Sequence, residues 1–159
     1  MENRLEELRK ILDRIVIESE PDQICMYASH MYGVSKFCTL LAKKRNLNAE
    51  LAATCGMLHD IGYMAGGSSD NHAAEGAKQA EALLQKMNAY SDNEINIITT
   101  AIANHSDKRT IHGAYEELLK DADVMDHCFY NGDFSVAEWE TDRYHNLLAE
   151  FGIKRTIQL

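Results

Sequence analysis

An adjacent histidine and aspartate, His59 and Asp60, stand in the run Leu-His-Asp-Ile-Gly at residues 58–62. Further histidines and aspartates occur on both sides of this pair: His30, His72, His105, Asp121 and Asp123. Neutral imidazole nitrogens and carboxylate oxygens are common ligands of divalent zinc, iron, manganese and nickel ions. If the fold brings these residues together, they predict a site for a divalent metal ion.

Apolar spacing predicts that two of these histidines point into the protein. His30 lies one turn before Val34 in a predicted helix over residues 24–45, so it borders an apolar stripe. His105 extends a stripe of isoleucines that recur at helical spacing from Ile95 onward. Both imidazoles are therefore expected on the inner faces of their helices.

His59 and Asp60 need a helix end to act together. Neighbouring residues on a helix point about 100° apart, so the pair can share an ion only where the helix stops, which we expect at Gly62. Taken alone, such a pair is more often a core histidine beside a surface aspartate. Here, however, four predicted helices each contribute one histidine and a fifth contributes aspartates. This combination favours a shared site over an isolated core histidine. Burying so many ionisable groups without a metal or a charge network is costly.

Helical periodicity recurs along the chain, and one proline and nine glycines leave most of it free to form helix. We expect an all-α fold, a single helical bundle of about six to seven helices. Asn48 and Ser91 are predicted to cap two of the helices, and the last helix is expected to pack Trp139. The predicted helices cover residues 2–18, 24–45, 49–61, 71–88, 92–105, 113–129 and 135–150, with a loop at 65–70.

Size and charge limit the class of protein. The 159 residues are enough for one ordinary core, so we expect a single domain over residues 1–159. A net charge of −9 argues against extended nucleic acid as a partner, because such binding needs a dense Lys and Arg footprint.

The four cysteines form no close pair and are predicted to be buried, reduced thiols. Without an apolar leader or spanning stretch, we expect no membrane partner and a cytoplasmic location. The oligomeric state is not indicated.

The order of the candidate ligands is specific. His30 comes first, then the pair His59 and Asp60, then a late aspartate in the segment Lys-Asp-Ala-Asp-Val-Met-Asp at 120–126. This order resembles the HD-domain superfamily of metal-dependent phosphohydrolases, whose motif is H, HD and D on a helical fold. The likeness covers residues 25–130. It implies a metal ion held by His30, His59, Asp60 and Asp123. Asp123 matches the family position, although the neighbouring Asp121 stays open as an alternative.

Two further segments, around His72 and His105, resemble the extra histidine segments of HD subgroups that hold two metals. The resemblance implies that Asp60 lies between two ions and that His72 and His105 bind the second. The implied cofactor is one or two divalent transition-metal ions: Mn, Fe, Zn, Co or Ni. Asp60 would also accept a proton, and His72 or His105, where not bound to metal, would act as acid or base. No role is assigned to the remaining histidines: His112, His127 and His145.

The function implied by the resemblance is hydrolysis of a phosphate ester or anhydride bond in a small phosphorylated molecule, above all a nucleotide or phosphoester. Candidate contacts for the phosphate are three cations near the motif segments: Lys36, Lys108 and Arg109. The Gly-Lys and Gly-Tyr-Pro signatures of one large phosphodiesterase subgroup are missing, which disfavours a cyclic dinucleotide. An HD-type di-iron oxygenase and a non-catalytic HD sensor or scaffold remain alternatives, and the sequence names neither the substrate nor the native metal.

Overall fold

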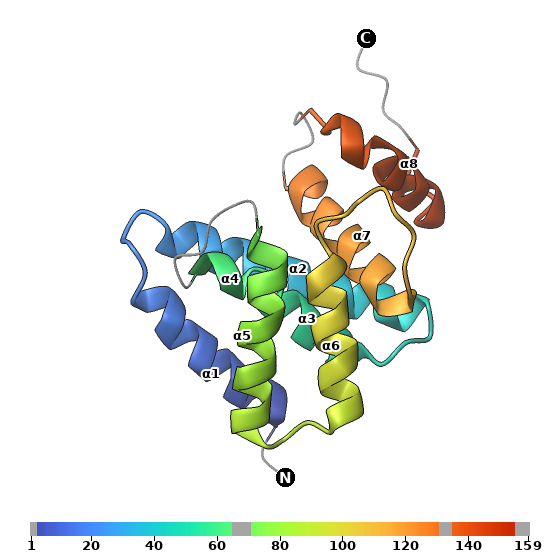
Figure 1. The fold of residues 1–159 in the computed structure, drawn as a ribbon. Coiled ribbons are helices and arrows are strands. Elements are labelled where there is room, and N and C mark those ends of the chain that lie inside the picture. The colour runs from blue at the N-terminus through green and yellow to red at the C-terminus, as the bar shows by residue number, and fades with distance from the viewer. Residues whose placement is uncertain (1–2, 65–70, 131–134, 155–159) are drawn as a thin grey trace.

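The computed structural model describes residues 3–64, 71–130 and 135–154, and these residues form helices but no strand (Figure 1). The predicted all-α fold is confirmed. The elements are α1 (Arg4–Ile17), α2 (Ile24–Lys44), α3 (Ala49–Leu58), α4 (Ile61–Met64), α5 (His72–Met87), α6 (Asp92–Asn104), α7 (Ala114–Phe129), the 3-10 helix η2 (Glu138–Glu140) and α8 (Thr141–Glu150).

Two predicted helix starts are confirmed by their caps. The side chain of Asn48 accepts hydrogen bonds from two backbone amides in the first turn of α3. Ser91 and Glu94 form a reciprocal capping box at the start of α6. At their other ends, α3 and α6 are followed directly by His59 and His105, which are their C-cap residues. Both imidazoles therefore stand at helix ends.

The helix α2 packs against α3 and α7, and its contacts with α3 are the most extensive in the structure. The helices α5 and α6 run side by side, and α6 also contacts α3 and α7 (Figure 1). Buried apolar side chains from these helices, α1 and α8 belong to one cluster. Leu8, Val34, Ile98 and Leu119, for example, are fully shielded from solvent. This core holds the middle of α2 next to the ends of α3 and α6.

The expectation that Gly62 ends the helix before it is wrong. The helix α3 already ends at Leu58, and the single turn α4 begins at Ile61. Gly62 lies inside α4, where a Cβ atom would come within 2.5 Å of the carbonyl oxygen of His72. Glycine at this position therefore permits α4 to approach the start of α5. That approach brings His72 towards the end of α3.

The predicted final helix over residues 135–150 is wrong at its start. The 3-10 helix η2 comes first, and α8 begins only at Thr141. Trp139, which we expected to be packed, is 59% exposed, whereas Leu147 and Leu148 are buried. A 3-10 helix has about 3.0 residues per turn. The α-helical spacing behind the prediction therefore does not apply to Trp139.

Cys25 is exposed, which corrects the prediction that all four cysteines are buried; the others are buried. Cys25 lies off the apolar stripe that Met31 and Val34 define on α2, which explains its exposure. The predicted loop at 65–70 lies outside the described residues. Among the described helices, none has the length and apolar character needed to cross a membrane.

We expect Gly62→Ala to lower the free energy of unfolding by about 1 to 3 kcal/mol, because the added methyl group meets backbone atoms that cannot turn aside. The same displacement moves His72 away from His59. Denaturant unfolding measures the loss. Gly113→Ala is the matched control, because a Cβ atom there meets only the flexible carboxylate end of Glu116. Equal effects of the two substitutions would contradict this account of the α4–α5 contact.

Candidate metal centre

Four side chains from three parts of the fold converge in what we call the first cluster. His30 in α2 and His59 after α3 direct their Nε2 atoms at each other across 3.1 Å. Oδ2 of Asp60 lies 3.3 Å from Nε2 of His59 and 3.6 Å from Nε2 of His30. Oδ1 of Asp123, from α7, lies 3.3 Å from Nε2 of His30 and 3.9 Å from Nε2 of His59. The first cluster thus offers two nitrogens and two oxygens to a common space.

A second cluster lies on the other side of Asp60 and consists of Asp60, His72 and His105. His72 is the first residue of α5 and His105 follows α6, and their Nε2 atoms are 3.3 Å apart. Oδ1 of Asp60 lies 3.4 Å from Nε2 of His105 and 3.8 Å from Nε2 of His72. The ligand atoms of this cluster all lie within 4.8 Å of one another. They could hold a metal ion.

Asp60 joins the two clusters. Its Oδ2 faces His59 and its Oδ1 faces His105. Burial alone would raise the pKa of Asp60, whereas protons on Nε2 of His59 and His105 hold that pKa well below its usual range; where these rings are neutral, a cation between the groups would have the same effect. The carboxylate is therefore ionised at neutral pH and offers one oxygen to each cluster. A carboxylate placed in this way could bridge two cations.

Backbone hydrogen bonds assign the protons of His59 and His105. Nδ1 of His59 lies 2.8 Å from the carbonyl oxygen of Gly56, and Nδ1 of His105 lies 2.7 Å from that of Ile102. A carbonyl oxygen can only accept, so both Nδ1 atoms donate and each neutral ring keeps a lone pair on Nε2. Burial lowers the pKa of His105, which keeps this ring neutral. Both rings are oriented as metal ligands commonly are.

These lone pairs face other acceptors. Nε2 of His59 and Nε2 of His105 lie 3.3 Å and 3.4 Å from the two oxygens of Asp60. Acceptors that face each other in a buried site repel unless a cation lies between them. Asp123 also requires a cation nearby, because its buried Oδ1 has no hydrogen-bond partner among the described residues. The donor set therefore fits divalent transition-metal ions.

Lys108 holds the other oxygen of Asp123. Its side chain is only 6% exposed, and its ammonium group bonds Oδ2 of Asp123 and donates to the carbonyl oxygen of His105 at 2.9 Å. Burial would raise the pKa of Asp123, but the charge of Lys108 helps to hold that pKa well below its usual range. Asp123 is thus ionised, with Oδ2 engaged and Oδ1 directed at the cluster. Lys108, a candidate phosphate contact in the sequence, is engaged with a candidate ligand instead.

Asp121, the alternative to Asp123, lies in a different network. Its carboxylate accepts from Arg45 at 2.8 Å and from Arg143 at 2.9 Å. These ion pairs join the end of α2, α7 and α8. The geometry therefore brings Asp123, and not Asp121, to the first cluster.

Three residues beside the first cluster were assigned no role from the sequence: Asp126, His127 and Glu140. Oδ2 of Asp126 lies 2.7 Å from Nδ1 of His30, an arrangement that orients a ligating imidazole. The ring of His127 stacks on that of His30 with centroids 5.1 Å apart, and Glu140 lies 3.1 Å from Nδ1 of His127. Asp123, Asp126 and His127 are spaced i, i+3 and i+4, which places them on one helix face. This spacing is the feature of the sequence that could have indicated that Asp126 and His127 lie beside Asp123.

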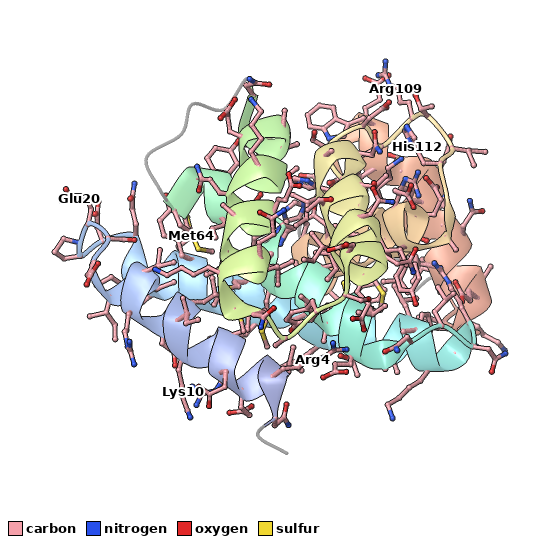
Figure 2. All side chains as sticks on the ribbon, turned by 60° about the horizontal axis from the view of Figure 1, so that its bottom comes forward. Arg4, Lys10, Glu20, Met64, Arg109 and His112 are labelled. Atoms are coloured by element: carbon pink, nitrogen blue, oxygen red, sulfur yellow. The ribbon has the colours of Figure 1, made fainter. Side chains whose placement is uncertain are left out.

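A cavity of about 420 Å³ opens over both clusters, and Tyr63, Ser106 and Trp139 form part of its wall. Lys36 is exposed and does not line this cavity. Arg109 is also exposed and lines a neighbouring cavity; Figure 2 shows it at the edge of the segment that joins α6 to α7. Neither of these two predicted phosphate contacts therefore lies in the cavity over the clusters.

The fold and the site define an all-α protein in which a converging set of histidines and aspartates could hold a metal. The family model of the HD domain matches residues 27–128, so the chain belongs to the HD domain family. The matched segment runs from α2 into α7 and contains every residue of both clusters. The resemblance seen in the sequence is thereby confirmed. No solved structure matches the chain.

We expect Asp123→Asn to weaken metal binding at the first cluster by at least about 10-fold, because Oδ1 loses its charge. Combined replacement of His59 and Asp60 by alanine should abolish metal retention. Elemental analysis after dialysis against Mn measures both effects. Asp121→Asn is the matched control, two residues away and bonded only to arginines. An Asp121→Asn protein that loses as much metal as Asp123→Asn would contradict the assignment.

We also expect metal binding to release a proton. Burial would lower the pKa of His30, but the carboxylates of Asp123 and Asp126 raise it to about 10. Below that pH the metal-free ring carries a proton that an ion at Nε2 must displace. Affinity should therefore rise with pH, by about tenfold per unit between about pH 7 and 9. Calorimetry in buffers of different ionisation enthalpy measures the proton release, and an affinity independent of pH would contradict this protonation state.

Proposed function

We propose that the chain is a metal-dependent phosphohydrolase that cleaves a phosphate ester or anhydride bond of a small phosphorylated molecule, above all a nucleotide. The position of Asp60 carries the proposal, because its two oxygens face two separate groups of imidazole nitrogens. The HD domain family consists in general of metal-dependent phosphohydrolases. The chain has a residue of the required type at each position of the H, HD and D motif.

The two clusters suit phosphoryl chemistry because that chemistry depends mainly on positioning and electrostatics. Divalent ions bound there would hold phosphoryl oxygens and lower the pKa of a water molecule. The second-layer contacts keep the side chains in place: Asp126 holds His30, Lys108 holds Asp123, and backbone carbonyls hold the other rings. In this proposal Asp60, the carboxylate shared by both clusters, would also accept a proton.

The cysteines support water as the attacking group. Burial raises the pKa of Cys55 to about 12 and that of Cys128 to about 11, and it raises the pKa of Cys38 as well. These groups are therefore thiols, and weak nucleophiles, at neutral pH. None of the described residues that line the cavity over the clusters is a cysteine. Hydrolysis needs no protein nucleophile in such a site.

Charge supports dependence on metal. Among the described residues that line the cavity, Lys108 is the only lysine or arginine, and it is already paired with Asp123. Without bound cations the carboxylates of Asp60 and Asp123 would repel a phosphate group. Binding of a phosphorylated substrate should therefore require the ions.

Two other functions use the same fold. An HD-type di-iron oxygenase would use the same nitrogen and oxygen ligands, so oxygen consumption by iron-loaded protein separates it from a hydrolase. A non-catalytic sensor or scaffold has no need for convergent ligands. The complete set of ligand candidates in the two clusters favours an enzyme over that third function.

We expect phosphate release from at least one nucleotide or generic phosphoester, lost on chelation and restored by Mn, Fe, Co or Ni. His72→Ala and His105→Ala should each lower kcat/KM by about 100-fold or more, because the second cluster loses a ligand that stabilises developing charge. A colorimetric phosphate assay over a panel of nucleotides and phosphoesters provides the measurement. His145→Ala is the control, because His145 is exposed on α8 and does not line the cavity.

Full activity in both His72→Ala and His105→Ala would restrict the catalytic site to the first cluster. A panel without phosphate release under any metal, together with oxygen uptake by the iron-loaded protein, would replace the phosphohydrolase with the oxygenase.

A further inference from the structure

A second cavity, of about 470 Å³, lies beside the metal centre and shares two wall residues with the cavity over the clusters, Lys108 and Trp139. Its volume falls within the range of about 300 to 1,000 Å³ that is typical of small-molecule sites. Because the two cavities share walls, one ligand can place a reacting group at the clusters and another group in this neighbouring space.

Trp139 is the main aromatic surface between the two cavities. Its side chain is 59% exposed, whereas the adjacent Glu140 is buried and bonds His127 beside the first cluster. This contact holds η2, which carries the indole, beside the metal centre. A large aromatic ring exposed at the edge of a polar site is typical of a ligand contact.

The far wall of the second cavity is fixed as well. The guanidinium group of Arg143 donates to Glu117 at 2.7 Å, to Asp121 at 2.9 Å and to the carbonyl oxygen of Lys108 at 2.8 Å. These bonds tie α8 to α7 and to the segment after α6. The cavity therefore exists before a ligand binds, which lowers the entropic cost of binding.

The charge of this cavity suits the uncharged part of a substrate. Of its cations, Lys108 and Arg143 are already bonded to carboxylates, whereas the guanidinium group of Arg109 has no partner among the described residues. Glu138 and Asp142 also line the cavity and are exposed. Such a mixed wall does not attract a phosphate strongly, but its carboxylates can accept hydrogen bonds from ribose hydroxyls or amino groups of a base.

We propose that Trp139 is the stacking platform for the base of a nucleotide whose phosphate lies at the metal clusters. The inference rests on the proposed function and names its substrate class, a nucleotide with an intact aromatic base. Every base offers a π-face to an indole, and stacking of this kind adds affinity with little dependence on base identity. Arg109 lies on the same wall, where its free guanidinium can bond the base or ribose.

Trp139 is the only tryptophan of the chain and lines both cavities, so intrinsic tryptophan fluorescence reports on the wall that they share. We expect adenosine and adenosine 5′-monophosphate to quench this fluorescence in Mn-loaded protein, and ribose 5-phosphate and inorganic phosphate to leave it unchanged. Adenosine carries no phosphate to hydrolyse, so its titration does not depend on catalysis. Quenching by ribose 5-phosphate equal to that by adenosine 5′-monophosphate would overturn the stacking role.

Variants test the same contact by affinity. Trp139→Leu should raise the KM for an accepted nucleotide by about 10-fold to 100-fold, with kcat, metal content and the KM for ribose 5-phosphate unchanged. Trp139→Phe should restore most of the affinity. The matched control is Tyr130→Leu, because Tyr130 is 84% exposed and lines a separate cavity on the other side of His30 and His127.

The outcomes separate this inference from the proposed function. If no phosphate is released from any compound but adenosine 5′-monophosphate still quenches Trp139, and Trp139→Leu loses its affinity in calorimetry, the base platform stands without the hydrolase. If nucleotides are hydrolysed with unchanged KM in Trp139→Leu, the platform is wrong and the hydrolase stands. A loss of nucleotide affinity in Tyr130→Leu alone would place the base on the opposite side and would also overturn the inference.

Discussion

The carboxylate of Asp60 lies between two pairs of imidazole nitrogens that cannot all donate hydrogen bonds to it. The Nδ1 atoms of His59 and His105 are committed to backbone carbonyl oxygens, so their Nε2 lone pairs face the carboxylate across 3.3 Å and 3.4 Å. A buried arrangement of acceptors is stable only with a cation or extra protons between them. The surrounding helices hold these acceptors together although they repel one another. A metal ion bound between them best explains this arrangement.

The positions of the ligand candidates follow from helix ends and from a layer of supporting contacts. His59 and His105 follow the last turns of α3 and α6, and His72 begins α5. Lys108 ties Asp123 to the end of α6, and the Arg143 network ties α8 to the same segment. The match to the HD domain ends at residue 128, so η2 and α8, which carry Trp139 and Arg143, lie beyond it. The chain thus combines a candidate metal centre inside the matched segment with a neighbouring cavity whose wall includes residues beyond that segment.

Much of this fold was predictable from the sequence because helices depend on local periodicity, whereas the choice of His72 and Asp123 as candidate ligands came from the resemblance to the HD-domain superfamily. Helical spacing located the helices, the caps at Asn48 and Ser91 set two of their starts, and the inward stripes of α2 and α6 carried His30 and His105 to the core. Features that depend on contacts between distant segments were not predictable in the same way. Glycine at position 62 permits α4 to approach α5 and does not end a helix. The pairing of Lys108 with Asp123 depends on the packing of α6 against α7.

The most direct test of the central claim is anomalous scattering from crystals grown with Mn. The account predicts two ions, one bound by His30, His59 and Asp123 and the other by His72 and His105, with Asp60 contacting both. A single ion, with His72 and His105 hydrogen-bonded to other groups, would contradict the bridging role of Asp60.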